Sequence, residues 1–257
     1  MMPTVMPEKT LSILSIVLAV ITQNKSLSFV AAELKTDAVH GSRRLETLPV
    51  RSTRIHGGWN SKEDRYSYAQ VNLKWQLEGH QCGGSVVAPD MILTAGHCKE
   101  SFDKIEIGKH EKNDITDLSE EFDPDFEILH PDFDEETTRF DVMLVKLKGT
   151  TTMATPVRLN KDEALPPNGM MLTVIGMGYN GIWELPNVFQ ETNVQYQVND
   201  QCEKIVDENE ITLKGDLYPD MLCAGSEGRD SCYGDSGSPL VLKGSNEQED
   251  IQVGVVR

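Results

Sequence analysis

The sequence is short of positive charge. Its 24 lysine and arginine residues stand against 41 aspartate and glutamate residues, which gives a formal net charge of −17 at pH 7. Phosphate backbones and anionic lipid headgroups repel so acidic a chain. The charge balance therefore argues against nucleic acid or an anionic membrane surface as a partner.

The sequence also lacks an apolar run that is clearly long enough to span a membrane. The apolar run at residues 11–21 is too short to cross a bilayer comfortably, and Lys9 precedes it. Small residues at 30–32 offer a cleavage site. We therefore predict a secretory signal peptide at residues 1–32 and a secreted, extracellular protein. A membrane anchor is the alternative, since residues 27–32 could extend the run.

Cysteines are few and odd in number. There are five, so at least one cannot pair within the chain. A secreted protein reaches an oxidising compartment, in which disulfides persist. Spacing alone does not choose the partners.

Long helical periodicity, repeats and low-complexity tracts are absent. Short apolar runs separated by turn residues occur instead, at 85–87, 91–94, 104–107 and 172–175. Such runs are typical of strands, and their close spacing predicts an all-β barrel class. A stretch rich in threonine and proline at 154–167 predicts a linker between two units. Polar residues 33–54 predict a short propeptide.

Ser236 lies in a glycine-rich turn between Gly234 and Gly237. A serine hydroxyl is a poor nucleophile unless a base takes its proton and N–H groups stabilise the oxyanion that follows. Glycines let the backbone approach a substrate closely. Upstream, His97 lies in the stretch Thr94–Cys98 and Asp141 in the stretch Phe140–Val145, so the order is His, Asp, Ser.

The competing nucleophile elbow, Gly-x-Ser-x-Gly, does not fit. Position 238 is serine rather than glycine, and no histidine follows Ser236, although the partners of an elbow serine come after it. The sequence therefore favours a triad of the His–Asp–Ser order.

With these stretches, and with Arg54–Gly58, Cys82–Ser85 and Met221–Gly225, the chain resembles the chymotrypsin/trypsin family of serine proteases from about residue 54 to its last residue. The resemblance implies two six-stranded antiparallel barrels with the active site between them. It also implies hydrolysis of protein or peptide substrates through an acyl-enzyme, without a cofactor. Residues 55–257 would form this peptidase domain.

The same resemblance assigns the catalytic roles. Ser236 would be the nucleophile and His97 the general base, while Asp141 would hold the histidine tautomer and stabilise the imidazolium. The backbone N–H groups of Gly234 and Ser236 would form the oxyanion hole. Asp230 would form the floor of the specificity pocket and favour Lys or Arg in the substrate.

Activation is implied as well. An activating protease would cleave after Arg54 and free the amino group of Ile55, which would pair with Asp235 and order the oxyanion hole. His56 stands where the family usually has Val or Ile, so insertion could be less favourable or pH-sensitive.

Disulfides are carried over in the same way: Cys82 with Cys98 and Cys202 with Cys223, which leaves Cys232 over. Acidic residues concentrate at 114–136, which predicts a solvated loop. Some relatives bind calcium nearby, but Lys109 occupies the position of their first carboxylate ligand, so no metal site is predicted.

The chain departs from the family at several positions. Ser238 replaces a usual glycine, Met177 stands where Gly-Trp-Gly is common, and Arg257 ends a strand that the family continues. We expect the second barrel to be incomplete at the C-terminus, with an open strand edge and a missing pocket wall. Two hypotheses follow: a truncated sequence of an active protease, which we favour, or a catalytically weak homologue acting as a secreted binding protein.

Overall fold

The computed structural model describes residues 55, 57–75, 79–179, 185–204, 215 and 217–257, together with the backbone of Ser28–Val30. No helix within these ranges is long and apolar enough to cross a membrane. The predictions of a signal peptide and a propeptide lie almost entirely outside the described residues, as do Arg54 and His56.

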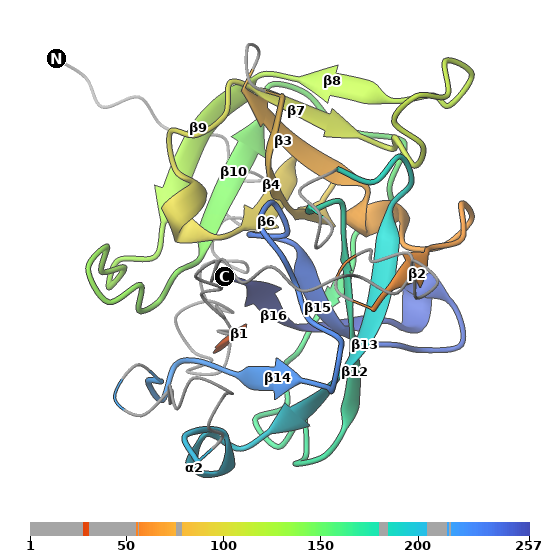
Figure 1. Ribbon diagram of the computed structural model, residues 1–257. Coiled ribbons are helices and arrows are strands. Elements are labelled where there is room, and N and C mark those ends of the chain that lie inside the picture. Colours follow the sequence, from red (N-terminus) through yellow and green to blue (C-terminus); the bar gives the residue numbers. More distant parts are fainter. Residues whose placement is uncertain are drawn as a thin grey trace, which may run out of the picture.

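The first half of the fold consists of two four-stranded antiparallel sheets, in the orders β4-β3-β7-β8 and β5-β6-β10-β9 (Figure 1). Its strands are β3 (Val71–Trp75), β4 (Gly79–Gly83), β5 (Ser85–Ala88), β6 (Met91–Thr94), β7 (Lys104–Ile107), β8 (Glu120–Phe122), β9 (Pro124–Leu129) and β10 (Met143–Leu147). The predicted strands in this half are confirmed.

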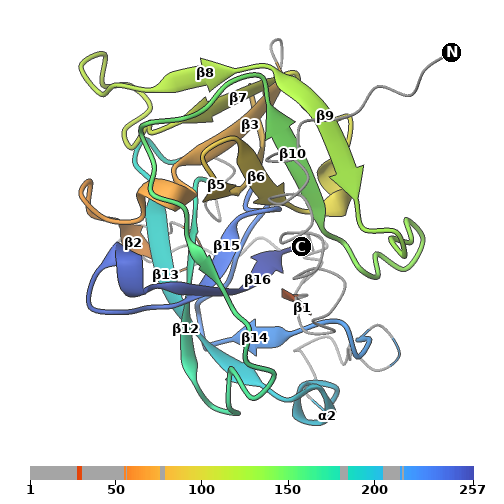
Figure 2. The same ribbon diagram turned by 180° about the vertical axis from the view of Figure 1, so that it is seen from behind.

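The second half is one sheet in the order β1-β16-β15-β12-β13-β14, with β11 paired to β16 and β2 to β13 (Figures 1 and 2). Its strands are β1 (Ser28–Val30), β2 (Trp59–Asn60), β11 (Arg158–Leu159), β12 (Met171–Gly176), β13 (Gln190–Gln197), β14 (Cys223–Gly225), β15 (Pro239–Leu242) and β16 (Ile251–Val256). Helical segments are short: η1 (Ser67–Ala69), η2 (Gly96–Cys98), α2 (Asn199–Cys202) and η3 (Glu247–Glu249). The all-β class is therefore confirmed.

The pairing of β6 with β10 places two of the predicted catalytic residues. Both strands are buried because most of their side chains are apolar. Leu93 and Leu144, which pair with each other, are each 0% exposed. Thr94 pairs with Met143 at the end of the ladder. The segments just beyond, which carry His97 and Asp141, therefore lie side by side.

Strand β16 does not have the open edge that the sequence predicted. One side pairs with β15, while on the other side β11 pairs with Ile251–Gln252 and β1 pairs in parallel with Gly254–Val256. A strand edge presents unpaired backbone groups that accept another strand. In the full chain residues 28–30 take that position, contrary to the predicted open edge. These residues belong to the predicted signal peptide, so removal of that segment would expose the edge again.

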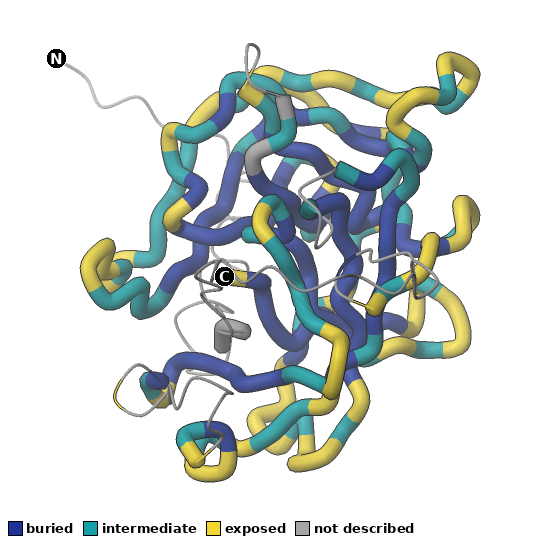
Figure 3. Tube along the Cα trace, viewed as in Figure 1, coloured by how far each residue is buried: buried dark blue, intermediate teal, exposed yellow. Residues whose placement is uncertain are grey.

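Most buried residues lie in the central strands of both halves, while the connecting loops and the edge strands β2, β8, β9 and β11 are half-buried or exposed (Figure 3). The largest apolar cluster includes members from both halves, such as Leu93 and Leu144 with Val241 and Val255. The two halves therefore share a core, and side chains at their junction are held from both sides.

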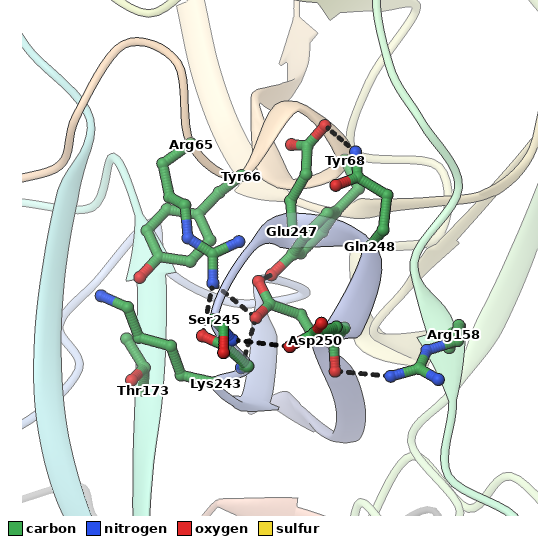
Figure 4. Close-up of polar contacts among 12 residues, drawn as sticks. Arg65, Tyr66, Tyr68, Arg158, Thr173, Lys243, Ser245, Glu247, Gln248 and Asp250 are labelled. Atoms are coloured by element: carbon green, nitrogen blue, oxygen red, sulfur yellow. Dashed lines mark hydrogen bonds and ion pairs between the residues drawn. The ribbon is translucent and has the colours of Figure 1, made fainter.

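Asp250 ties the N-terminal segment to the second half (Figure 4). Its carboxylate, 0% exposed, accepts hydrogen bonds from Arg65 Nη2 at 2.6 Å, the Tyr68 hydroxyl at 2.6 Å and the Gly244 backbone N–H at 2.7 Å. A buried charge is costly unless it is paired and hydrogen-bonded. Here both oxygens have donors, and one donor is a cation.

A second carboxylate supports the same segment. Glu191 on β13 accepts hydrogen bonds from Trp59 Nε1 at 2.7 Å, from Lys243 Nζ at 3.2 Å and from the Tyr66 hydroxyl. The segment that follows Ile55 is thus attached to the second half by two acidic side chains.

Candidate active site

His97 and Asp141 form a short, directed pair. His97 Nδ1 lies 2.6 Å from Asp141 Oδ2, and the His97 backbone N–H donates to Asp141 Oδ1, also at 2.6 Å. The Asp141 side chain is 0% exposed, whereas that of His97 is 33% exposed. With Nδ1 bonded to the carboxylate, Nε2 is the ring nitrogen left to take a proton.

Local sequence explains this approach. Gly96 lies beside the carboxylate, and a Cβ there would lie 3.1 Å from Asp141 Oδ1 and from the Phe133 ring. Cys98 is joined by a disulfide to Cys82 at the end of β4. Glycine therefore leaves room for the carboxylate, and the disulfide restrains the turn that carries His97.

The turn that carries Ser236 is attached to the same region of the first half. The Ser236 carbonyl accepts the Gly83 N–H at 2.8 Å. Gly234 and Gly237 have φ values of +88° and +84°, which glycine adopts without strain. A Cβ on Gly237 would lie 2.1 Å from Thr94 Oγ1. Gly237, the residue after Ser236, therefore lies against Thr94 at the end of β6. Thr94 precedes His97 by three residues.

Ser238 fits because two neighbours are glycine. Its side chain is buried, and a Cβ at Gly83 or Gly176 would lie 2.1 Å or 3.0 Å from its Oγ. The departure noted in the sequence is therefore accommodated by the absence of side chains opposite it.

His80 contributes to the site, although no functional role was predicted for it from the sequence. Its Nε2 lies 2.7 Å from the carbonyl oxygen of Gly234. Burial lowers the pKa of His80 to about 4, so the ring is neutral at physiological pH and Nε2–H is the donor. Only its position two residues before Cys82 could have indicated this contact.

Asp235 is buried, and no cation among the described residues contributes to its pKa. Its oxygens accept the N–H groups of Gly178 at 2.8 Å and Cys232 at 2.9 Å. A Cβ at Gly176 or Gly178 would collide with the carboxylate. Burial raises the pKa of Asp235 to about 7. Ile55, its predicted partner after cleavage, is also 0% exposed.

Asp230 lies six residues before Ser236 and is partly buried. The Ser231 backbone N–H donates to its Oδ1 at 2.8 Å. Burial raises the pKa of Asp230 to about 6, and no cation of the described residues offsets this. The carboxylate is therefore ionised at neutral pH and available to a cationic group.

Both predicted disulfides are confirmed, Cys82–Cys98 and Cys202–Cys223, and Cys232 is a free thiol. Burial raises the pKa of that thiol. Ligand atoms of Cys82, His97 and Cys98 lie within 4.8 Å of one another. Because the two sulfurs are joined in a disulfide, this group does not provide thiolate ligands for a metal.

Lys109 occupies the loop that was considered from the sequence for a calcium site. Its ammonium donates to the backbone carbonyls of Asp114 and Asp117, while Asp117 Oδ2 accepts the N–H groups of His110 and Glu111. The carbonyls already have a cationic partner, and a divalent ion beside an ammonium would be repelled. These residues do not fit a calcium ion.

An imidazole held by a buried carboxylate, with a serine in a glycine turn attached to the same region, is typical of serine hydrolases. The sequence model of the Trypsin family matches residues 55–257. Serine protease 28 of Mus musculus is 34% identical over 219 residues, which cover 77% of this chain and 74% of that protein. Trypsin V-A of Rattus norvegicus is 32% identical over 195 residues, covering 74% and 75%. Duodenase-1 of Bos taurus is 31% identical over 199 residues, covering 74% and 76%.

The chain therefore belongs to the trypsin family, and it is a serine endopeptidase that acts on protein or peptide substrates.

Proposed function

We propose that this serine endopeptidase is secreted, is made as a zymogen and cleaves after Lys or Arg. Residues 1–32 would be the signal peptide, residues 33–54 the propeptide and residues 55–257 the peptidase domain. The observation that carries the catalytic assignment is the 2.6 Å contact between His97 Nδ1 and Asp141 Oδ2, because it prepares Nε2 as a base.

In the proposed reaction, Ser236 Oγ attacks the carbonyl carbon of the scissile bond while its proton passes to His97 Nε2. The tetrahedral intermediate collapses as the C–N bond breaks, and Nε2 gives the proton to the leaving amine. Water then attacks the acyl carbon while its proton passes to His97 Nε2. The bond from that carbon to Ser236 Oγ breaks, Nε2 returns the proton to Oγ, and the carboxylic acid leaves. Asp141 stabilises the imidazolium in both steps.

The backbone N–H groups of Gly234 and Ser236 would stabilise the oxyanion. Loss of one such donor costs roughly 10²–10³ in rate. The bond from His80 to the Gly234 carbonyl and the bond from Gly83 to the Ser236 carbonyl support the conformation of this turn.

Preference for Lys or Arg would come from Asp230. An ionised, partly buried carboxylate without a cationic partner among the described residues suits a guanidinium or ammonium, which binds it by charge-assisted hydrogen bonds.

Activation would follow cleavage after Arg54. Asp235 is buried and its pKa is raised, so the uncleaved chain holds a carboxylate that favours protonation. A free ammonium at Ile55 would supply the missing charge and stabilise the turn that carries Gly234.

A serine-directed phosphonate tests the catalytic assignment. After cleavage at Arg54, we expect label at Ser236 by mass mapping, together with hydrolysis of Arg and Lys esters. Ser236→Ala should abolish both, and Asp230→Asn should abolish ester hydrolysis but keep labelling by a small, uncharged phosphonate. Label on another residue, or no label, would show that Ser236 is not the nucleophile. N-terminal sequencing of the exported protein tests the two processing sites.

A further inference from the structure

The segment that carries Asp141 is held from the other half of the molecule. Asp220, which precedes β14, accepts hydrogen bonds from Arg139 Nε at 3.0 Å and from the Phe140 backbone N–H at 2.9 Å. Its side chain is only 7% exposed. Figures 1 and 2 show the loop between β9 and β10, to which Arg139 and Phe140 belong, extending toward the second half.

Phe140 has a backbone conformation that a bulky residue rarely adopts. Its φ is +50°, in the left-handed region, and the same holds for Thr138 at +51°. For a non-glycine residue this conformation costs about 1–2 kcal/mol, and it persists only where the surroundings impose it.

Contacts around Phe140 supply that constraint. Its ring stacks on His130, with centroids 4.9 Å apart and planes 8° apart. The Arg139 guanidinium lies 5.0 Å from the Phe140 ring centroid and 5.0 Å from that of Tyr218 in the second half. Asp220 fixes the Phe140 N–H, and the Phe140 carbonyl accepts the Val142 N–H at 2.7 Å. The turn across Asp141 is therefore closed on both sides.

We propose that Asp220 is a positioning residue for catalysis, holding the strained Phe140 peptide so that Asp141 meets His97. If the Phe140 N–H loses its acceptor, φ can relax to a negative value and rotate the peptide next to Asp141. The carboxylate then no longer bonds both the backbone and the ring of His97. This inference rests on the proposed catalytic role of the His97–Asp141 pair.

Asp220→Ala, in the activated protein, should lower kcat on the order of 10- to 100-fold with KM within about twofold, because misplacement of a catalytic group affects the transition state. Adding Phe140→Gly should restore most of kcat, since glycine adopts positive φ without strain. Asp220→Asn, which keeps an acceptor for the Phe140 N–H, should stay close to the parent. Activity is expressed per site titrated with phosphonate, so that misfolded molecules are not counted.

The matched control is Asp90→Ala. It removes an ion pair of 2.9 Å with Lys146 at the other end of β10, far along the strand from Asp141. Its kcat should equal that of the parent. An unchanged kcat in Asp220→Ala, or a loss that Phe140→Gly does not restore, would overturn the proposal.

A proton NMR measurement on the uncleaved Ser236→Ala protein separates this proposal from the proposed function. The low-field resonance of the His97 Nδ1 proton reports its bond to Asp141 and needs no turnover. It should shift or broaden in Asp220→Ala and return when Phe140→Gly is added. An unaltered resonance would contradict the positioning role, whereas an inactive parent with a normal resonance would contradict only the proposed function.

Discussion

Two buried carboxylates in the second half, Asp250 and Asp235, are each 0% exposed but have opposite surroundings. Asp250 has the Arg65 guanidinium at 2.6 Å. Asp235 has two backbone N–H donors, no cationic contribution to its pKa from the described residues, and a pKa raised to about 7.

If the protein is activated by cleavage as proposed, the difference separates a part of the molecule that is complete before cleavage from a part that is not. Arg65 follows Ile55 by ten residues and is already bonded to the second half through Asp250. In the proposed activation, the residues between Ile55 and β2 would bring the freed ammonium to Asp235. Asp250 is therefore a permanent anchor, whereas Asp235 would receive its counter-charge only after the proposed cleavage.

Removing the anchor should have the largest effect. Asp250→Ala leaves the Arg65 side chain, 13% exposed, without its counter-charge, and we expect a loss of about 3–5 kcal/mol in the free energy of unfolding. Urea unfolding measures it. Asp123→Ala, which breaks an exposed ion pair with Lys104, is the control and should lose far less. Equal losses in the two variants would remove the distinction.

Asp235→Asn should leave the uncleaved fold intact but prevent activation. Asparagine carries no charge for the Ile55 ammonium, so the turn with the oxyanion donors stays unsupported. After cleavage at Arg54, ester hydrolysis should be roughly 10²–10³ lower than in the parent, comparable to loss of an oxyanion donor. Full activity in the cleaved variant would show that Asp235 has no part in activation.

The pH dependence of the uncleaved chain sharpens the comparison. Because the folded pKa of Asp235 lies near 7 and the unfolded one near 4, the folded state binds more protons between these values. Its contribution to stability is therefore present at low pH and lost as pH rises through about 7. Relative to Asp235→Asn, the parent should lose roughly 2–4 kcal/mol between pH 4 and 8. If the difference in the free energy of unfolding between the parent and Asp235→Asn did not change with pH, the pKa of Asp235 would not be raised in the folded state.

Lys109 provides a smaller test of an internal cation. Lys109→Met keeps most of the aliphatic stem but removes the donor to the carbonyls of Asp114 and Asp117. We expect the free energy of unfolding to fall by about 1–3 kcal/mol, as for a hydrogen bond with a charged partner. Calcium or a chelator should not change the melting temperature of the parent. A clear rise with calcium would show that the loop binds the ion.

Much of the site could be predicted because its residues lie in short local motifs. His97, Asp141 and Ser236 stand in characteristic stretches, and the apolar run at Met91–Thr94 indicates a strand. The positions of the disulfides followed from the resemblance. Neighbouring residues also supply the space that these side chains require. Gly96, for example, leaves room for the Asp141 carboxylate beside His97.

The supporting contacts could not be predicted, because they join residues far apart in the sequence. His80 and Gly234, or Asp220 and Phe140, meet only after the two halves pack together. Asp250 lies in a polar stretch that resembles a solvated loop, yet it is buried. The expected open edge of β16 is covered in the full chain because residues 28–30, which belong to the predicted signal peptide, pair with it.

The rate at which a small phosphonate labels Ser236, before and after cleavage at Arg54 by immobilised trypsin, tests the central claim most directly. If Asp235 waits for the Ile55 ammonium, cleavage should raise the rate roughly 100-fold or more in the parent, and the Asp235→Asn variant should show no such rise. Equal labelling of the uncleaved and cleaved parent would contradict the account.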